Sequence, residues 1–307
     1  MNNKSVAVIG QGFVGGSLTT VMSEHGFTVY TYDKTGKRAP GGRCPREDGF
    51  EADSVAGLVD ACERVPGFPG VYFVCVPTPM YEDGSADLSI VQGVLEELAS
   101  VAGERTAVVK STVPPGSTET WNKMFGPRGL HVVFNPEFLT EANALDDMRN
   151  QNRIVLGGPR PWINTVKQVY QTAFPKVPVI KTSSTTAEMV KYTTNCFLAT
   201  KVAFANEMAQ ICETLDSHGF DIDYDKVVEY AKVDPRLGTS HWSVPGPDGD
   251  RGFGGHCFPK DIRALMKVAE EFGVRPRVML GAWEKNQEVR MDRDWERQVG
   301  RAVSKRS

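Results

Sequence analysis

The sequence has no excess of either charge. Its 307 residues include 35 Lys and Arg and 38 Asp and Glu, a formal net charge of −3. The absence of a basic excess disfavours a nucleic-acid partner, and the near-neutral balance disfavours an anionic membrane surface. A membrane-spanning helix needs about 18 consecutive apolar residues, and no run in this sequence approaches that length. The N-terminal MNNKSVAVIG leads directly into an apolar strand. We therefore expect no signal peptide or transmembrane helix and a cytoplasmic protein.

Cysteine is sparse and unpatterned. The six cysteines form no CxxC pair, and the five histidines make no ligand-spaced cluster with them. This spacing predicts no structural metal and fits the reducing cytoplasm. A hydrophobic content of 40% is ordinary, and a chain of this length can bury a full core and should hold two domains.

A glycine-rich turn stands near the N-terminus. GQGFVG at residues 10–15 follows an apolar run at 6–9 and precedes a helical pattern, and a second apolar run at 28–32 ends on Asp33. This order is the fingerprint of a dinucleotide-binding unit. Gly10 makes the turn, Gly12 lets a pyrophosphate approach backbone amides, and Gly15 permits close helix packing. Asp33 would accept the ribose hydroxyls and favours NAD over NADP, because a 2′-phosphate would meet a like charge.

Strand-like and helical patterns alternate over the rest of the N-terminal half. Buried strands are expected at 71–76, 106–110, 132–134, 154–156 and 177–180, with helices near 88–101, 115–125 and 161–173. The alternation predicts an α/β fold with a Rossmann-like, doubly wound parallel sheet, whose ligands bind beyond the carboxyl ends of the strands.

A long stretch without proline or glycine follows at residues 183–218. It exceeds the length of a Rossmann crossover, so we expect one long helix or two nearly continuous ones, largely buried, that form the spine of a second, all-α domain. Lys191 and Asn195 are four residues apart and share a helix face. Helices are also expected at 259–273 and about 276–290. We place domains at 1–182 and 183–290, followed by a tail at 291–307 that we interpret as a fraying, solvated helix.

One cysteine lies in an unusual setting, GFGGHCFPKD at residues 252–261. Pro259 fits the first position of a helix, so the Cys257 sulfur should lie at a helix N-terminus. The partial positive charge of the helix end and nearby Lys260 both favour the nucleophilic thiolate. A lone cysteine is more often a small buried hydrophobe, and the rest of the chain has to decide between the two interpretations.

Read in order, these motifs resemble the UDP-glucose/GDP-mannose dehydrogenase family of nucleotide-sugar dehydrogenases. The resemblance rests on the fingerprint, STVPPG at 111–116, NPEFLTE at 135–141, the Lys191/Asn195 face and GFGGHCFPKD, and covers about residues 4–290. The last motif matches the family's Gly-Gly-x-Cys-x-Pro-Lys-Asp without a gap. The resemblance implies an NAD-dependent, four-electron oxidation of UDP-glucose to UDP-glucuronate through a thiohemiacetal and a thioester on Cys257.

The resemblance also implies roles for individual residues. Lys191 and Asn195 would donate hydrogen bonds to the substrate oxygen as it becomes anionic. Thr112 and Asp261 would hold the hydrolytic water, and Glu137 would accept or relay protons. The implied cofactor-binding residues are Gly10, Gly12, Phe13, Val14, Gly15, Asp33, Arg38, Thr78, Thr112, Glu141 and Lys260. The implied substrate-binding residues are Glu137, Phe138, Leu139, Thr140, Glu141, Lys191, Asn195, Arg236, Gly252, Phe253 and Gly254.

Arg236 matches an arginine that in relatives reaches the partner's site, which implies a homodimer built on the long helix.

Two features depart from the family pattern. The segment at 243–251 is longer than in many relatives, and the chain stops where relatives continue into a C-terminal UDP-binding domain. Either a compact enzyme or a fragment of a longer one would account for the second departure.

Three other functions remain open. GDP-mannose or another nucleotide sugar would use the same catalytic residues. A two-electron hydroxyacid dehydrogenase also joins a Rossmann domain to a helical domain, but it has no need of Cys257. A non-catalytic, truncated paralogue could sense NAD or a nucleotide sugar, although retention of the full catalytic set disfavours this reading.

Overall fold

The computed structural model describes residues 4–37, 39 and 53–305. Their backbone divides into two compact units. The first unit comprises residues within Met1–Thr78 and Leu88–Lys191. The second unit comprises residues within Pro79–Asp87 and Tyr192–Ser307.

The described part of the first unit contains one sheet of seven strands. In chain order the strands are β1 (Ser5–Ile9), β2 (Thr28–Tyr32), β3 (Val71–Val74), β4 (Arg105–Val109), β5 (Leu130–Phe134), β6 (Ile154–Gly157) and β7 (Val179–Thr182), and their order in the sheet is β2-β1-β3-β4-β5-β6-β7. Each expected strand is present. Buried on both faces, β1, β3 and β4 need continuous apolar runs, which is why the sequence shows them clearly.

The sheet is mostly parallel, as expected, and departs from that pattern at one pair of strands. β5 and β6 pair antiparallel, while the other neighbouring strands are parallel. Between them the chain makes only the 3₁₀ helix η3 (Glu141–Asn143) and the short helix α5 (Ala144–Arg149). A six-residue helix is too short for a crossover back along the sheet, so β6 starts at the edge where β5 ends.

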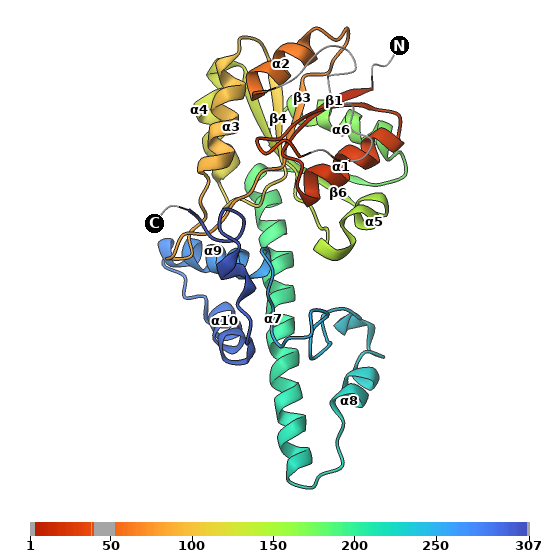
Figure 1. Ribbon diagram of the computed structural model, residues 1–307, viewed down its shortest axis with the longest axis vertical. Coiled ribbons are helices and arrows are strands. Elements are labelled where there is room, and N and C mark those ends of the chain that lie inside the picture. The colour runs from red at the N-terminus through yellow and green to blue at the C-terminus, as the bar shows by residue number, and fades with distance from the viewer. Residues whose placement is uncertain (1–3, 38, 40–52, 306–307) are drawn as a thin grey trace. The chain divides into compact units, whose positions relative to one another are not determined.

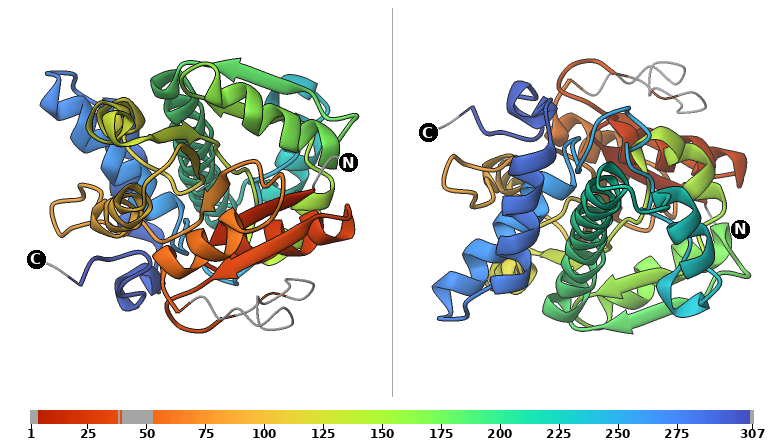
Figure 2. Two further views of the ribbon diagram at one scale, coloured as in Figure 1. Left: turned by 90° about the horizontal axis from the view of Figure 1, so that it is seen from above. Right: turned by 90° about the horizontal axis from the view of Figure 1, so that it is seen from below.

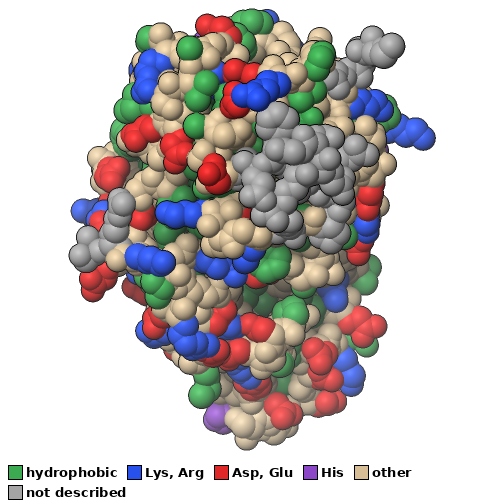
Figure 3. Space-filling model, turned by 45° about the horizontal axis from the view of Figure 1, so that its top comes forward, with side chains coloured by type: hydrophobic (Ala, Val, Ile, Leu, Met, Phe, Trp, Pro, Cys, Tyr) green, Lys and Arg blue, Asp and Glu red, His purple; other side chains and the backbone are tan. Residues whose placement is uncertain are grey.

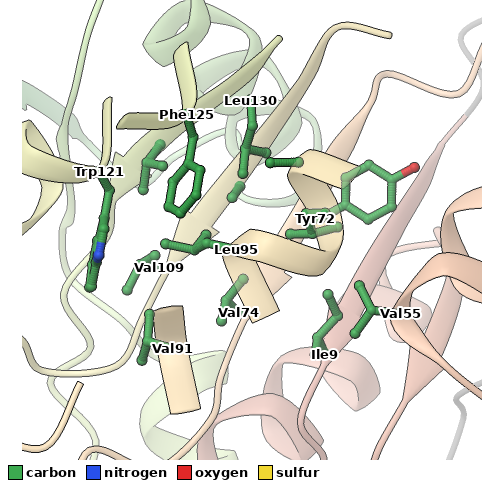
Figure 4. Close-up of a cluster of buried hydrophobic side chains, with 14 of the residues drawn as sticks. Ile9, Val55, Tyr72, Val74, Val91, Leu95, Val109, Trp121, Phe125 and Leu130 are labelled. Carbon is green, nitrogen blue, oxygen red and sulfur yellow. The ribbon is translucent and has the colours of Figure 1, made fainter. Parts of the chain in front are cut away.

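Helices cover both faces of the sheet, as expected for a doubly wound fold (Figure 1). One face packs against α2 (Val55–Glu63), α3 (Ser89–Ser100) and α4 (Ser117–Phe125), and the other against α1 (Phe13–Glu24) and α6 (Trp162–Ala173). Figure 4 shows the first core, where Trp121, Phe125 and Leu95 lie over strand residues such as Val74 and Val109. The short helices α2 and α5 were not expected from the sequence.

The predicted long helix is confirmed as α7, Ser184–Ser217, which Figure 2 shows as one uninterrupted helix. Its first turns belong to the first unit, where Glu188 accepts hydrogen bonds from the backbone N–H of Gly116 (2.6 Å) and Thr118 (2.9 Å) at the start of α4. The expectation that α7 is largely buried is wrong on one side. Phe197 is 67% exposed, and Phe204 and Ile211 follow at seven-residue spacing, also exposed.

The second unit is otherwise helical, with α8 (Tyr224–Ala231), the 3₁₀ helix η4 (Pro235–Leu237), α9 (Phe258–Glu271) and α10 (Arg277–Val289). Helices α9 and α10 confirm the two predicted C-terminal helices, whereas α8 was not expected. Tyr192, Ala199 and Ile262 contribute to a core shared by α7, α9 and α10.

The last segment is not the solvated, fraying helix we expected. Residues 294–297 form the 3₁₀ helix η5 (Asp294–Arg297), and the Trp295 ring within it is 2% exposed. Trp295 packs with Met80 and Ala302, and Met80 also pairs with Val303 in a β-bridge. The segment Pro79–Asp87 therefore belongs to the second unit because the C-terminal residues bind it there.

The surface agrees with the balanced composition. Acidic and basic side chains are interspersed over the face that Figure 3 draws. Within the described residues, no helix combines the length and the apolar character that crossing a membrane requires.

Candidate functional site

The turn between β1 and α1 is closely packed at one glycine and open at another. Gly10 has φ +89°, and a Cβ on Gly15 would lie 1.8 Å from the Gly10 carbonyl oxygen, so only glycine fits at residue 15. A Cβ on Gly12 would meet nothing within 4 Å. Gly12 also precedes the first residue of α1 and gives that helix no side-chain cap. The turn thus fits a pyrophosphate approaching Gly12 at a helix N-terminus.

Asp33 follows β2 and faces the same turn. Its Oδ2 accepts a hydrogen bond from the Gln11 N–H at 2.7 Å, and its Oδ1 accepts from the Thr35 N–H (2.8 Å) and hydroxyl (2.6 Å). Partial burial raises the pKa of Asp33, but the hydrogen bonds from Thr35 and Gln11 outweigh it and leave the pKa lowered. A fixed, ionised carboxylate suits two ribose hydroxyls. Arg38 lies outside the described residues.

Polar side chains tie together the carboxyl ends of the central strands. The Thr78 hydroxyl donates to the Thr112 carbonyl oxygen at 2.8 Å, and the Ser111 hydroxyl donates to the Val76 carbonyl oxygen at 2.6 Å. Thr78 and Thr112 are both buried. The two strand ends after β3 and β4 are therefore held as one rigid edge.

Lys191 and Glu137 form a buried ion pair within the first unit. The amine of Lys191 donates to Glu137 Oε1 at 2.9 Å and to the Glu137 carbonyl oxygen at 2.6 Å, and the two side chains are 3% and 9% exposed. Burial raises the pKa of Glu137, but Lys191 and the Leu139 N–H, which donates to Oε2 at 2.7 Å, leave it lowered. Glu137 is thus an ionised carboxylate, already hydrogen-bonded to the lysine expected to contact the substrate.

Lys110 is a buried cation that the sequence reasoning missed. Its amine donates to Asn135 Oδ1 at 2.9 Å, and Asn135 in turn donates to the Val155 carbonyl oxygen at 2.8 Å. Burial lowers the pKa of Lys110, while the same burial raises the pKa of the neighbouring Cys75 thiol to about 12. Lys110 and Glu137 line one cavity of about 220 Å³. A lysine that closes an apolar strand directly before Ser-Thr was the available signal.

The loop after Glu137 is also held in place. The guanidinium of Arg153 lies 4.1 Å from the centre of the Phe138 ring, and the Thr140 N–H and hydroxyl both donate to Asp147 Oδ2, at 2.7 and 2.6 Å. Leu139 is half-buried beside the second core, whereas Glu141 opens η3 and is exposed. Residues 138–140 therefore present a fixed backbone.

The second unit brings together Asn195, Lys260 and Asp261. Asp261 is 1% exposed and accepts from Asn195 Nδ2 at 2.6 Å and from the Lys260 amine at 2.5 Å. The Asp261 N–H donates to the Cys257 carbonyl oxygen at 3.0 Å, the first backbone bond of α9. One buried carboxylate thus joins an amide and a cation one helical turn from the cysteine.

Cys257 is the N-cap residue of α9, in accord with the predicted place at a helix N-terminus. The helix begins one residue earlier than expected, at Phe258, so Pro259 is its second residue. Cys257 is partly exposed and is not in a disulfide. Gly255, two residues before Cys257, has a φ of +71°.

Arg236 and Phe253, two of the expected substrate-binding residues, have very different environments. Arg236 in η4 is 86% exposed and pairs with its own neighbour Asp234. The Phe253 ring is 4% exposed and packs against Phe258 and Trp283, so its side chain belongs to the core. Among the residues that the structure describes, no group of three or more His, Cys, Asp or Glu side chains could hold a metal ion.

Comparison with known proteins identifies the family. Residues 60–174 match the NAD binding domain, and residues 185–288 the central domain, of the UDP-glucose/GDP-mannose dehydrogenase family. AglM of Haloferax volcanii, a UDP-glucose 6-dehydrogenase, is 31% identical over 92% of this chain and 69% of its own length. The chain belongs to the UDP-glucose/GDP-mannose dehydrogenase family.

Membership identifies the first unit as the NAD-binding domain of this oxidoreductase family. YtcA of Bacillus subtilis is 34% identical over 87% of this chain, and the chain spans 63% of the length of YtcA. A UDP-glucose dehydrogenase structure from Pyrobaculum islandicum superposes with a TM-score of 0.78 at 29% identity, over 93% of this chain and 68% of that one. The dehydrogenase fold predicted from the sequence is therefore confirmed.

Proposed function

We propose that the protein oxidises the 6-hydroxymethyl group of UDP-glucose to a carboxylate, using two NAD⁺ and one water per sugar. The observation that carries the proposal is the place of Cys257, at the N-terminus of α9 and one turn from the buried Asn195–Asp261–Lys260 cluster. Family membership and the similarity to AglM support UDP-glucose as the substrate.

Cys257 is the reason that two oxidations can follow each other in one site. NAD⁺ bound to the first unit would accept one hydride at each oxidation. The Cys257 thiolate adds to the carbonyl carbon of the intermediate aldehyde and forms a C–S bond, giving a thiohemiacetal. Loss of a second hydride, together with the hydroxyl proton, leaves a thioester. Water then breaks the C–S bond, which releases the carboxylate and two protons and restores the thiolate.

Lys191 and Asn195 supply hydrogen bonds to the substrate oxygen as it becomes anionic, a contribution of about 3 kcal/mol per donor in a dry site. Both donors are already oriented by carboxylates, Lys191 by Glu137 and Asn195 by Asp261. Lys191 and Asn195 lie one turn apart on α7 and so share a helix face. Glu137, ionised and hydrogen-bonded to Lys191, takes up the alcohol proton, and Thr112 and Asp261 hold the hydrolytic water.

The remaining contacts follow the same assignment. The pyrophosphate of NAD⁺ binds at Gly12, and its ribose at Asp33. The fixed backbone at 138–140, Glu141 and the glycines Gly252 and Gly254 clamp the sugar nucleotide. These contacts are consistent with the open space at Gly12 and with the hydrogen bonds that hold residues 138–140.

Progress curves with limiting sugar test the proposal. The native chain should produce two NADH per UDP-glucose, and Cys257→Ser should lower turnover by about a thousandfold without loss of NAD binding. NADH formation from GDP-mannose but not from UDP-glucose would reassign the substrate. One NADH per sugar, with Cys257→Ser unaffected, would instead indicate a two-electron dehydrogenase. Tight NAD binding without turnover of any nucleotide sugar would indicate a sensor.

We also propose that the chain acts as a homodimer. The exposed Phe197, Phe204 and Ile211 form an apolar stripe along α7, and Arg236 is exposed in the same unit. A second copy would cover the stripe and receive Arg236 in its site. Light scattering should then show a dimer that Phe197→Asp dissociates.

Mixing Arg236→Ala with Cys257→Ser tests whether Arg236 acts in the partner's site. Each variant alone should be nearly inactive. If Arg236 crosses the interface, each mixed dimer keeps one site with both native residues, and about a quarter of native activity should return. No recovery after subunit exchange would restrict Arg236 to its own subunit.

A further inference from the structure

The backbone of the glycine loop before Cys257 is held by side chains from three distant segments. Asn206 of α7 accepts from the Gly252 N–H at 3.2 Å, and Asp294 of η5 accepts from the Gly255 N–H at 3.0 Å. Between these anchors, Asn286 of α10 bonds to Phe253 twice, accepting from its N–H at 2.6 Å and donating to its carbonyl oxygen at 3.0 Å. Three of the four loop residues 252–255 thus have their amides bound by side chains.

The loop and Asn286 fit each other closely. Asn286 is fully buried, and Asn206 is 1% exposed. Gly252 has φ +70°, and a Cβ at this position would lie 2.2 Å from Asn286 Oδ1. Only glycine allows Asn286 to reach the Phe253 backbone, so the glycine required here is explained by the asparagine clamp.

Arg290, the C-cap residue of α10 four positions after Asn286, supports the third anchor. Its side chain is 3% exposed and pairs with Asp248 at 2.7 Å, Asp294 at 3.3 Å and Asp250 at 3.4 Å. Three carboxylates around one buried guanidinium compensate its charge. Arg290 therefore holds Asp294 in the direction of the Gly255 amide.

An amide side chain loses its bound water when it is buried, which has a cost in free energy. Hydrogen bonds offset that cost only if the amide is placed accurately, so the geometry of these side chains matters. Residue 255 is two positions before Cys257, and the Cys257 carbonyl oxygen accepts the first backbone bond of α9. Fixing residues 252–255 from one side and α9 from the other leaves little freedom in the direction of the Cα–Cβ bond of Cys257. The side chain that carries the sulfur therefore leaves the backbone in a restricted direction.

We propose that Asn286, together with Asn206 and Asp294, positions the nucleophile Cys257. The proposal rests on the function proposed above, in which Cys257 is the nucleophile. The three positioning residues themselves contact neither substrate nor cofactor. It assigns α10 and the segment after it a part in catalysis that acts through the loop backbone.

Asn122 provides a matched control. On α4 in the first unit it makes the same pair of bonds with Val132, donating to the carbonyl oxygen at 2.8 Å and accepting from the N–H at 2.9 Å. Asn286→Ala and Asn122→Ala each remove one such clamp, so both should lower the thermal midpoint by similar amounts. They should differ in their effect on Cys257.

Two measurements separate positioning from a merely structural role. In Asn286→Ala, kcat should fall about tenfold or more while KM for NAD stays within about twofold, and alkylation of Cys257 by iodoacetamide, followed by mass spectrometry, should change at least about threefold in rate. Asn122→Ala should leave kcat and the alkylation rate of Cys257 within about twofold of the native values. A native alkylation rate in Asn286→Ala, or an equal change in Asn122→Ala, would overturn the proposal.

Asp294 gives a second test if Asn286→Ala does not fold. Asp294→Ala removes the acceptor for the Gly255 amide, whereas Asp294→Asn retains an oxygen there. Alkylation of Cys257 should change in the alanine variant and return toward the native rate in the asparagine variant, and equal rates in both would overturn the proposal. If the native chain oxidises no nucleotide sugar, the proposed function fails, but the alkylation comparison still decides whether these residues position Cys257.

Discussion

Lys191 holds Glu137 at two points, with the amine 2.9 Å from the carboxylate and 2.6 Å from the carbonyl oxygen of the same residue. The two residues are 54 positions apart in the sequence, and both side chains are buried. Under the proposed function, the pair would set in advance the distance between the proton acceptor and a donor to the substrate oxygen, so substrate binding would not have to organise them.

Removing one member of this pair should be more harmful than removing both. Lys191→Met leaves a buried carboxylate without its cation, and the free energy of unfolding in urea at neutral pH should fall by about 3 kcal/mol. Lys191→Met combined with Glu137→Gln removes both charges and should recover at least half of that loss. Additive losses in the double variant would contradict a direct interaction.

The same pair predicts how stability depends on pH. The pKa of Glu137 is lowered from its ordinary value of 4.5, so its contribution to stability is complete above that value and is lost as the pH falls through the lowered pKa. Native protein should therefore progressively lose its stability advantage over Glu137→Gln as the pH falls below 4.5. Urea unfolding of the two proteins across this range measures the difference, and a constant difference would show that Glu137 gains nothing from ionisation.

Gly12 and Gly15 should respond differently to the same substitution. Gly15→Ala places a methyl group against the Gly10 carbonyl oxygen, so the free energy of unfolding should fall by about 2 kcal/mol. Gly12→Ala meets open space and should keep its thermal midpoint, while NAD affinity measured by calorimetry falls about tenfold or more. Unchanged NAD affinity in Gly12→Ala would place the pyrophosphate elsewhere.

Asp33 should determine the choice between NAD and NADP. Its carboxylate is fixed by Gln11 and Thr35, so Asp33→Ser removes both the ribose acceptor and the charge that repels a 2′-phosphate. NAD should bind about tenfold more weakly in this variant, and the preference for NAD over NADP should narrow. Thr35→Ala, which keeps the backbone donor to Asp33, is the control and should retain most of the preference. An undiminished preference in Asp33→Ser would exclude this role.

Local features of the chain were predictable to within a few residues. The strands appear as apolar runs because a doubly wound sheet buries both faces. Residues 183–218 were predicted as one helix or two nearly continuous ones because no glycine or proline interrupts them. Pro259 likewise placed Cys257 at a helix N-terminus. Each of these features depends on neighbours in the sequence.

The errors concern contacts between distant residues. The reversal of β6 depends on how a short helix fits at the sheet edge, and the burial of Trp295 depends on Met80, more than two hundred residues earlier. Lys110 carries only a weak local signal, its place at the end of an apolar strand, and Asn286 carries none, since a lysine after a strand or an asparagine in a helix is usually solvated. Only the contacts that surround these side chains reveal them.

The amino-acid sequence alone therefore determined the strands, the longer helices, the glycine turn and the position of Cys257 at the start of α9, because backbone preference and hydrophobic periodicity act over a few residues. The tertiary structure decided that Lys191 pairs with Glu137, that Asn195 pairs with Asp261 and that Asn286 binds the glycine loop. Such pairs form between side chains that only the completed packing brings within hydrogen-bonding distance, where burial makes an unpaired polar group costly.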